Sequence, residues 1–270
     1  MSFRKEILDH GYLELVDTWG SEEQIIEAAR MSTGKGFIGW GPIEKVCVHC
    51  HEGRVNVAMD AFHVSGVTDC PKCAGTGKVK GSGDEKLLRY LWENKHSTPF
   101  EMAGLTIEVQ APIFVFREWH RHRVPFSYNE MSARYVPLPD VNYVPTIERL
   151  MMNAGGSNKQ AGVVKGAVEL TTLAAEAFQK MLFELYATAE VAYRVALEKG
   201  VPKELARVHL PVGRYSRMRA SANLRGWLAF ISLRSAPNAQ WEIRQYSDAV
   251  GELIGRLFPR TWSLFQESKK

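Results

Sequence analysis

The segment 121–134 concentrates side chains that suit an anionic ligand. Within fourteen residues it carries three arginines, one histidine and two serines: Arg121, His122, Arg123, Ser127, Ser132 and Arg134. An arginine guanidinium binds phosphate through two parallel hydrogen bonds. The neighbouring residues on both sides are apolar or aromatic, which argues against an ordinary solvated turn. The segment therefore predicts a site for one or more phosphorylated ligands.

Two Cys-x-x-Cys pairs form a second chemical pattern. Cys47 and Cys50 make the first pair, and Cys70 and Cys73 make the second, with nineteen residues between them. Four thiolates at this spacing match a tetrahedral zinc site with a closed shell, and the glycines after each pair permit tight turns. Two disulfides are the alternative, which a cytoplasmic chain disfavours. We expect a structural zinc, with three further candidate ligands nearby: His49, His51 and His63.

Composition limits the classes of protein that remain. The chain has 270 residues, of which 45% are hydrophobic and 24% are charged, as is usual for a globular protein. The net charge of +4 is too mild for a general nucleic-acid-binding protein. The N-terminus lacks the apolar core of a secretory signal, and no apolar run has the ~18 residues of a membrane span. We expect a cytoplasmic protein with no membrane contact. If zinc takes all four cysteines, no cysteine remains as a nucleophile.

The elements that must position these groups follow from periodicity and breaking residues. Helices are predicted over 21–32, 84–94, 164–199, 203–208, 224–233 and 239–257, with another after Pro112. Strands are predicted over 105–109 and 217–222, and 136–163 is predicted as a loop. The fold class is therefore α+β, with helices packed on a small, mostly antiparallel sheet. We expect a single domain over 1–270 with an inserted four-cysteine zinc-binding module over 46–79.

Several segments, taken in order, resemble the flavin-dependent thymidylate synthases. The family signature reads Arg-His-Arg, a spacer and Ser, with Ser-x-Asn-Glu inside, and 121–134 is similar to it. His96-Ser97-Thr98-Pro99-Phe100-Glu101 resembles a second family segment. Further similar stretches lie at 14–17, 28–32, 111–115, 206–211, 223–225, 233–234 and 239–243. Any one of these is a weak signal, but their shared order is specific.

The resemblance implies an activity and a set of ligands. Family members transfer a one-carbon unit from methylenetetrahydrofolate to dUMP, giving dTMP, with FAD as hydride carrier and NADPH as the usual reductant. They are homotetramers that bind FAD and dUMP at subunit interfaces. Nucleic acid is not an expected partner. The arginine that matches Arg234 polarises the pyrimidine by favouring loss of its N3 proton, which a fixed guanidinium does by stabilising negative charge on the ring.

The resemblance also implies which residues bind each ligand. Expected FAD contacts are Ser32, His96, Thr98, Arg121, His122, Arg123, Asn223 and Arg225. Expected dUMP contacts are Glu118, Trp119, His120, Arg121, Glu130, Met131, Ser132, Ala133, Arg134, Arg207 and Arg234. Considered without the resemblance, His96 would be a capping or core residue, and Arg207 and Arg234 would form surface salt bridges. Trp227, Phe230 and Trp241 are expected in the core.

The chain departs from the family pattern at four places. The signature has one extra residue, within Val124-Pro125-Phe126, and a loop there would absorb it. Glu118 stands where the family usually has Gln, which places a negative charge beside the nucleotide unless an arginine pairs with it. Ala229 and Asn238 replace an Asn and a flavin-contacting His. Two other functions stay open: hydroxymethylation of a pyrimidine nucleotide, and nucleic-acid binding by a non-catalytic zinc protein.

Overall fold

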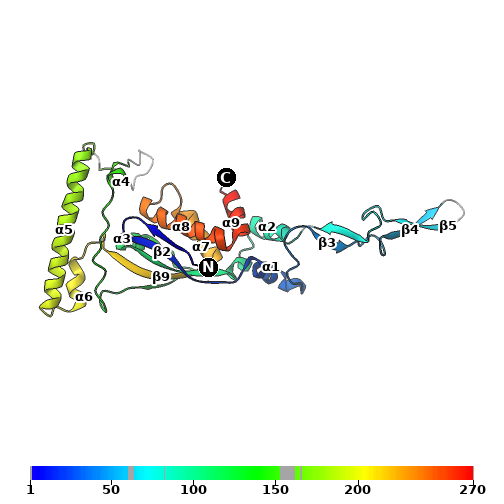
Figure 1. The fold of residues 1–270 in the computed structure, drawn as a ribbon, viewed down its shortest axis with the longest axis horizontal. Helices are drawn as coiled ribbons and strands as arrows, with labels where there is room; N and C mark the ends of the chain where they lie inside the picture. Colours follow the sequence, from blue (N-terminus) through cyan, green and yellow to red (C-terminus); the bar gives the residue numbers. More distant parts are fainter. Residues whose placement is uncertain (1, 60–63, 82, 153–161, 165, 270) are drawn as a thin grey trace.

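The computed structural model describes residues 2–59, 64–81, 83–152, 162–164 and 166–269. Its centre is a five-stranded antiparallel sheet in the order β1-β2-β7-β9-β8. The strands are β1 (Arg4–Ile7), β2 (Gly11–Trp19), β7 (Gly104–Pro112), β8 (Ser127–Glu130) and β9 (Tyr215–Asn223). Helices pack on this sheet (Figure 1), which confirms the predicted fold class.

The two central strands show why one face of the sheet is buried. In β7 and β9, Gly104 lies opposite Asn223 and Pro112 lies opposite Tyr215. Leu105, Ile107 and Val109 are fully buried and alternate with less buried residues, as the period of two predicted. The opposite face is polar and carries exposed arginines at Arg217 and Arg219.

The helices that cover the buried face create an aromatic core. They include α3 (Ile113–Trp119), α7 (Leu224–Arg234), α8 (Trp241–Leu257) and α9 (Pro259–Glu267). At one edge lie α1 (Glu22–Arg30), η1 (Met31–Thr33), α2 (Glu85–Glu93) and η2 (Thr98–Glu101). Trp119 of α3 stacks on Phe230 of α7 with ring centroids 4.8 Å apart. Trp227 and Phe230 are wholly buried as predicted, whereas Trp241 is only partly buried. The sheet and its covering helices are called the body below.

A long helix stands at one end of the body (Figure 1). This end contains α4 (Ile147–Met151), α5 (Thr172–Glu198), α6 (Lys203–Ala206) and η3 (Arg207–His209). The prediction that α5 begins at residue 164 was wrong, because the Thr171 side chain caps the helix by accepting from the backbone of Ala174. It ends before Gly200, as predicted. The loop predicted over 136–163 contains α4, and residues 153–161 lie outside the described part.

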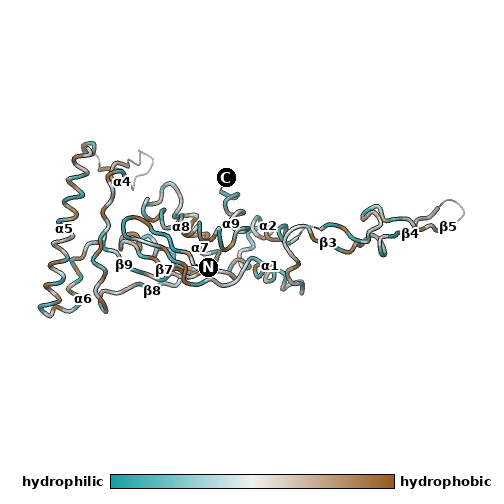
Figure 2. Tube along the Cα trace, viewed as in Figure 1, coloured by the Kyte–Doolittle hydropathy of each residue, from teal (hydrophilic) through white to brown (hydrophobic). Residues whose placement is uncertain are grey.

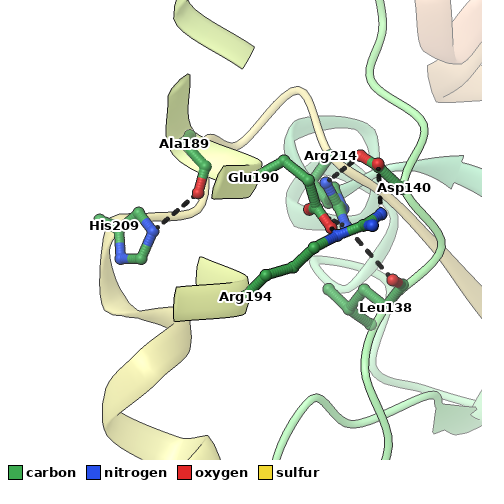
Figure 3. A network of polar contacts seen from close by, with 7 residues as sticks. All are labelled: Leu138, Asp140, Ala189, Glu190, Arg194, His209 and Arg214. Atoms are coloured by element: carbon green, nitrogen blue, oxygen red, sulfur yellow. Dashed lines mark hydrogen bonds and ion pairs between the residues drawn. The ribbon is translucent and has the colours of Figure 1, made fainter. Parts of the chain in front are cut away.

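A polar network attaches α5 to the body (Figure 3). The guanidinium of Arg214 is 1% exposed and donates to Asp140 at 3.0 Å and to the Leu138 carbonyl at 3.3 Å. It also lies 2.8 Å from the carboxylate of Glu190 on α5. Arg194, one turn further along α5, bonds to both Glu190 and Asp140. Burial of one arginine between two carboxylates therefore adds a charged contact to the small apolar contact of the helix.

A narrow arm projects from the opposite end of the body (Figure 1). It spans residues 43–81 and consists of two antiparallel ribbons: β3 (Ile43–Val46) with β6 (Lys78–Gly81), then β4 (Arg54–Met59) with β5 (Val64–Asp69). At its root Asp84 is fully buried and accepts from Arg30, from Ile38 N at 2.8 Å and from Gly39 N at 3.3 Å. Glu85 accepts from Gly41 N at 2.6 Å, so two adjacent carboxylates hold the root of the arm to the body.

Some elements were not predicted from the sequence. The strands β1, β2 and β8 and the helix α9 were missed, although Pro259 stands at the first turn of α9, where proline is favoured. The helices predicted over 84–94, 224–233 and 239–257 are confirmed with shifts of one or two residues at their ends. Among the helices of the described residues, none has both the length and the apolar character needed to cross a bilayer.

Candidate active site and four-cysteine cluster

Arg234 is the centre of a polar cluster between α3 and α7. Its side chain is only 15% exposed. Nε donates to His122 Nε2 at 2.8 Å, Nη1 donates to the Glu118 carboxylate at 2.6 Å, and Nη2 donates to the Glu118 carbonyl at 2.9 Å. The carbonyl belongs to the last turn of α3, where a cation is favoured. Three hydrogen bonds from two elements therefore fix the orientation of this guanidinium.

Glu118 is paired with an arginine, which the sequence alone did not establish. Arg117 and Arg121 are its neighbours along the chain, but Arg234 is the arginine that pairs with its carboxylate. The negative charge at this position is thus compensated within the same chain. His122 completes the cluster as a neutral imidazole, because burial and the charge of Arg234 lower its pKa to about 4. Its Nε2 therefore accepts the hydrogen bond from Arg234.

A cavity of about 550 Å³ brings together two of the expected FAD contacts. It lies between α2, η2, α7 and α9, and His96 and Arg225 line it. Arg225 forms an ion pair with Glu101 of η2, and Asn223 caps α7 by accepting from Gly226 N at 2.9 Å. Apolar side chains form much of the wall, and cationic side chains stand among them. The lining residues include Leu91, Trp92, Phe100, Leu228, Phe265, Lys95 and Lys269.

A third cluster contains residues expected to bind phosphate. Arg134 lies 3.5 Å from Glu204 of α6, and its backbone N–H donates to the Ser132 hydroxyl. Lys203 donates to the Tyr135 carbonyl at 2.9 Å. These contacts place the end of the signature beside the turn that carries Arg207. Within the described residues, the side chains of Arg121, Arg123 and Arg207 have no hydrogen-bonded carboxylate, so they are available to an anion.

Other expected site residues occupy different surroundings. The Trp119 side chain is 0% exposed and Ala133 is 2% exposed, so neither side chain presents a surface to a ligand within one chain. Glu130 of β8 lies 3.9 Å from His120, which also contacts Met218. Thr98 and Ser32 are exposed, in η2 and η1 respectively, and neither lines the cavity. Met131 borders a small hollow on the polar face of the sheet.

The departures from the family pattern have definite positions. The extra signature residue lies in the loop between α3 and β8, as predicted, and there the ring of Pro125 packs closely against Gly226 of α7. A side chain at position 226 would collide with this ring, so the loop depends on that glycine. Ala229 lines the cavity, where an Asn would have offered a polar group. Asn238 is exposed between α7 and α8.

Sequence reasoning missed the cationic rim of the cavity. Lys95 and Lys269 lie there with Ser232. Lys95 directly precedes His96, so its position beside an expected FAD contact could have indicated that it lines the same cavity. Lys269, near the end of the chain, sits over the ring of Phe265 at 4.4 Å, and no motif marks it. Burial lowers the pKa of Lys269 from its usual value.

The four cysteines converge at the middle of the arm. Their Sγ atoms all lie within 4.8 Å of one another, with Cys47 and Cys70 3.9 Å apart and Cys50 and Cys73 3.6 Å apart. A tetrahedral zinc with Zn–S bonds of about 2.3 Å requires sulfur separations of about 3.8 Å. No disulfide joins the four. His49 and His51 are not needed to complete the shell, and His63 lies outside the described residues.

The turns after the two pairs match each other. Glu52–Gly53 and Ala74–Gly75 both adopt left-handed backbone conformations, with φ between 48° and 89°. The two turns also touch, because a Cβ on Gly53 would meet the Gly75 carbonyl at 2.0 Å. The backbone N–H groups of Gly53 and Gly77 face the sulfurs of Cys50 and Cys73. Such donors stabilise thiolates and orient metal ligands.

The sheet, the Arg234 cluster and the cavity together define a class: an α+β protein with a fixed guanidinium and, in the part of the chain that the structure describes, further arginines without a carboxylate partner. Comparison with known proteins makes this definite. The family model described as "Thymidylate synthase complementing protein" matches residues 14–260. The chain therefore belongs to the flavin-dependent thymidylate synthase family, which confirms the resemblance and the assignment as an enzyme.

Individual relatives agree over nearly the whole chain. A flavin-dependent thymidylate synthase of Thermus thermophilus is 35% identical over 97% of this chain and 77% of its own length. That of Thermosipho melanesiensis is 32% identical, covering 96% of this chain and 92% of its own. A solved structure, the UMP/dUMP methylase PolB from Streptomyces cacaoi bound with 5-Br UMP, superposes with a TM-score of 0.71 at 27% identity. It covers 97% of this chain and 96% of its own chain.

Proposed function

We propose that this enzyme converts dUMP to dTMP, with methylenetetrahydrofolate as carbon donor and FAD as hydride carrier. The observation that carries the proposal is the fixed guanidinium of Arg234 within a chain that matches the family over residues 14–260. Relatives named for flavin-dependent thymidylate synthesis and for dUMP methylation support the same substrate.

Arg234 is the residue that activates the pyrimidine. A guanidinium held by His122 and Glu118 needs no reorganisation when charge develops on the ring, so it stabilises the form that has lost its N3 proton. Negative charge in the ring makes C5 a better nucleophile towards the one-carbon unit. The four cysteines all lie in the arm cluster, so none remains to attack C6 covalently.

The unpaired arginines bind the phosphates. Arg121, Arg123 and Arg207, together with Arg134 and Ser132, offer N–H and O–H donors to the phosphate of dUMP and to the diphosphate of FAD. The cavity with His96 and Arg225 suits FAD in chemical character, since an apolar wall accommodates a flat ring and the cationic rim accommodates its diphosphate. When bound, FAD supplies the hydride, which no side chain can provide. NADPH is the proposed reductant.

Assembly into a homotetramer is part of the proposal. The helix α5 exposes many large apolar side chains, and hydrophobic segments run along it in Figure 2. Leu173, Phe183, Leu185 and Val191 are each more than half exposed in one chain, and of this helix only Ala175 and Tyr193 are buried. Such a surface favours a subunit contact. Light scattering coupled to size-exclusion chromatography tests this, and a monomer at micromolar concentration would contradict it.

The four-cysteine cluster is proposed to hold a structural zinc. Sulfur separations of 3.9 and 3.6 Å match the tetrahedral requirement, and four thiolates leave no open position for water. The segment 46–79 is accordingly a module of its own within the single domain 1–270. Metal analysis of the purified protein should give one zinc per chain, which replacement of Cys50 and Cys73 by Ser removes.

Product analysis by mass spectrometry tests the reaction. The protein is supplied with FAD, dUMP, methylenetetrahydrofolate and NADPH at low oxygen, and the expected product is heavier by one methylene unit. Arg234→Ala should abolish it. A hydroxymethylated product would instead support the alternative in which water traps the intermediate. A parallel assay with UMP is warranted because the superposed solved structure is of a UMP/dUMP methylase.

A further inference from the structure

The imidazole of His122 lies between a cation and two phenylalanine rings. Its Nε2 accepts a hydrogen bond from Arg234 Nε at 2.8 Å. On α7, the ring of Phe230 meets it edge-on, with centroids 5.0 Å apart. Phe126, in the loop between α3 and β8, also contacts it, with centroids 6.2 Å apart. One ring nitrogen therefore anchors the guanidinium, while aromatic side chains cover part of the ring.

Phe126 belongs to the stretch in which the segment 121–134 has its extra residue. Its side chain is partly buried and stacks on Tyr128, with centroids 5.6 Å apart and planes within 8° of each other. It meets Trp227 edge-on at 4.7 Å and lies 6.1 Å from Phe230. Contacts with β8 and with α7 therefore hold the Phe126 ring in place beside His122.

Tyr128 fixes the main chain around His122. Its hydroxyl donates to the His122 carbonyl at 2.6 Å and lies 3.3 Å from the Trp119 carbonyl. Burial raises the pKa of Tyr128, so the hydroxyl keeps its proton and remains a donor. The main chain of His122 is thus held by Tyr128, and its side chain is held by Phe126 and Phe230.

We propose that Phe126 is a positioning residue for the Arg234 guanidinium, because it holds the His122 imidazole as a desolvated, neutral acceptor for Arg234 Nε. This inference rests on the proposed function, in which Arg234 activates the pyrimidine. Glu118 binds the two Nη atoms of Arg234, so His122 is the anchor of the third nitrogen. Phe126 acts through His122 and needs no contact with a substrate.

The charge state of His122 decides whether this anchor exists. A neutral imidazole that accepts at Nε2 carries its proton at Nδ1, whereas an imidazolium has a proton on both nitrogens and cannot accept. Burial is the largest cause that lowers the pKa of His122 to about 4, and the charges of Arg234 and Arg121 lower it further, against that of Glu118. Removal of Phe126 should admit water to the ring and raise this pKa towards 6.5. Protonation would then break the hydrogen bond and place a second cation beside Arg234.

Titration of His122 tests the first half of the inference without reliance on turnover. Histidine ring signals of the isotope-labelled, FAD-loaded full chain are followed by NMR, with His122→Gln to assign the signal. The unaltered enzyme should titrate near the pKa of about 4. In Phe126→Leu, Phe126→Val and Phe126→Ala the pKa should rise in that order, by about one unit or more in the last. The graded series gives a result even if Phe126→Ala does not fold.

Turnover tests the second half. A guanidinium that is held less firmly stabilises the transition state less, so kcat of Phe126→Ala should fall about tenfold at about pH 8, while KM for dUMP changes less than about threefold. Below about pH 6.5 kcat should fall further as His122 is protonated, a loss that the unaltered enzyme should not show above about pH 5. Phe126→Leu keeps an apolar cover and should retain kcat within about threefold.

Phe114→Ala is the matched control. Phe114 is also a partly buried phenylalanine, but it lies at the start of α3 and its ring contacts Tyr143. Its loss should lower the urea midpoint about as much as Phe126→Ala does. The titration of His122 and the pH dependence of kcat should stay as in the unaltered enzyme.

Three outcomes would overturn the inference. If the pKa of His122 is unchanged in Phe126→Ala, Phe126 does not shield the ring. If that pKa rises but kcat and its pH dependence match those of Phe114→Ala, His122 does not anchor Arg234. If the unaltered enzyme forms no dTMP, the proposed function fails and takes the catalytic half of the inference with it. The titration distinguishes this last case, because it requires no product.

Discussion

In the body, large side chains such as Trp119, Trp227 and Phe230 are wholly buried between helices and sheet. In the arm, by contrast, the buried side chains among those that the structure describes are three of its four cysteines. Only Cys50, Val55 and Val79 pack partly against those cysteines among the described residues. Burial of apolar area stabilises the body. The arm has too little of it, so under the proposed zinc assignment its order depends on the metal that would join its two ribbons.

The largest effect that separates the two regions should come from removal of the metal. Replacement of Cys50 and Cys73 by Ser should remove a zinc contribution of about 10 kcal/mol or more and unfold the arm. Hydrogen exchange should become fast over 43–81 while β7 and β9 stay protected. The urea midpoint of the body should stay within error. Cooperative loss of both regions would show that the arm is not independent.

A cavity made in the aromatic core should destabilise the body and leave the arm unchanged. Phe230→Ala removes a wholly buried ring that contacts Trp119 and Trp227, so the free energy of unfolding should fall by about 3–5 kcal/mol. Urea denaturation at neutral pH measures this. Zinc content should be unchanged, and Val48→Ala on the exposed surface of the arm is the control with no expected effect.

Acid should weaken the body through His122. Because its pKa is lowered from 6.5 to about 4, the folded state favours the neutral ring, and the unfolded chain binds a proton that the folded chain does not. The free energy of unfolding is therefore unaffected by His122 above about pH 6.5. It falls by about 1–2 kcal/mol, after solvent screening, as the pH drops from there towards 4. Urea midpoints between pH 7 and 4 should fall less in His122→Gln. Parallel curves for the two proteins would exclude His122 as the cause.

The smallest effect is expected for a surface ion pair of the arm. Lys78 and Glu44 lie 3.0 Å apart across β3 and β6, with side chains that are 64% and 67% exposed. Lys78→Ala should change the stability of the arm by less than about 0.5 kcal/mol and leave its zinc affinity unaltered. A larger loss, measured by competition with a chelator, would show that charge as well as metal holds the ribbons together.

Local patterns in the sequence were enough to predict the two central strands and most of the helices of the body. The helices near 84–94 and 224–233 and the strands near 105–109 and 217–222 were predicted because their apolar residues repeat with a clear period. The cysteine cluster was also predictable, since ligand spacing is a local property. The strand β2 was missed, because its second half is largely exposed and its alternation is weak.

The partner of Glu118 illustrates what the sequence did not contain. Arg117 and Arg121 are near in the chain, but α3 directs the carboxylate towards Arg234, which is 116 residues away. Only the packing of α3 on α7, through Trp119 and Phe230, establishes that contact. The cavity is likewise formed by segments from both halves of the chain, so Lys269 could not be assigned to it beforehand.

The root of the arm has a practical consequence for protein engineering. The chain leaves the body at Gly39 and returns at Asp84, whose backbone N–H donates to the Gly39 carbonyl at 2.9 Å. Two chain ends that meet in this way form a natural insertion point, because the cost of closing a longer loop rises only slowly with its length. A fluorescent protein or an affinity domain whose termini lie close together can be exchanged for 43–81 at this junction. The inserted domain of such a chimera would be attached at a fixed position on the enzyme, while the body keeps its own core.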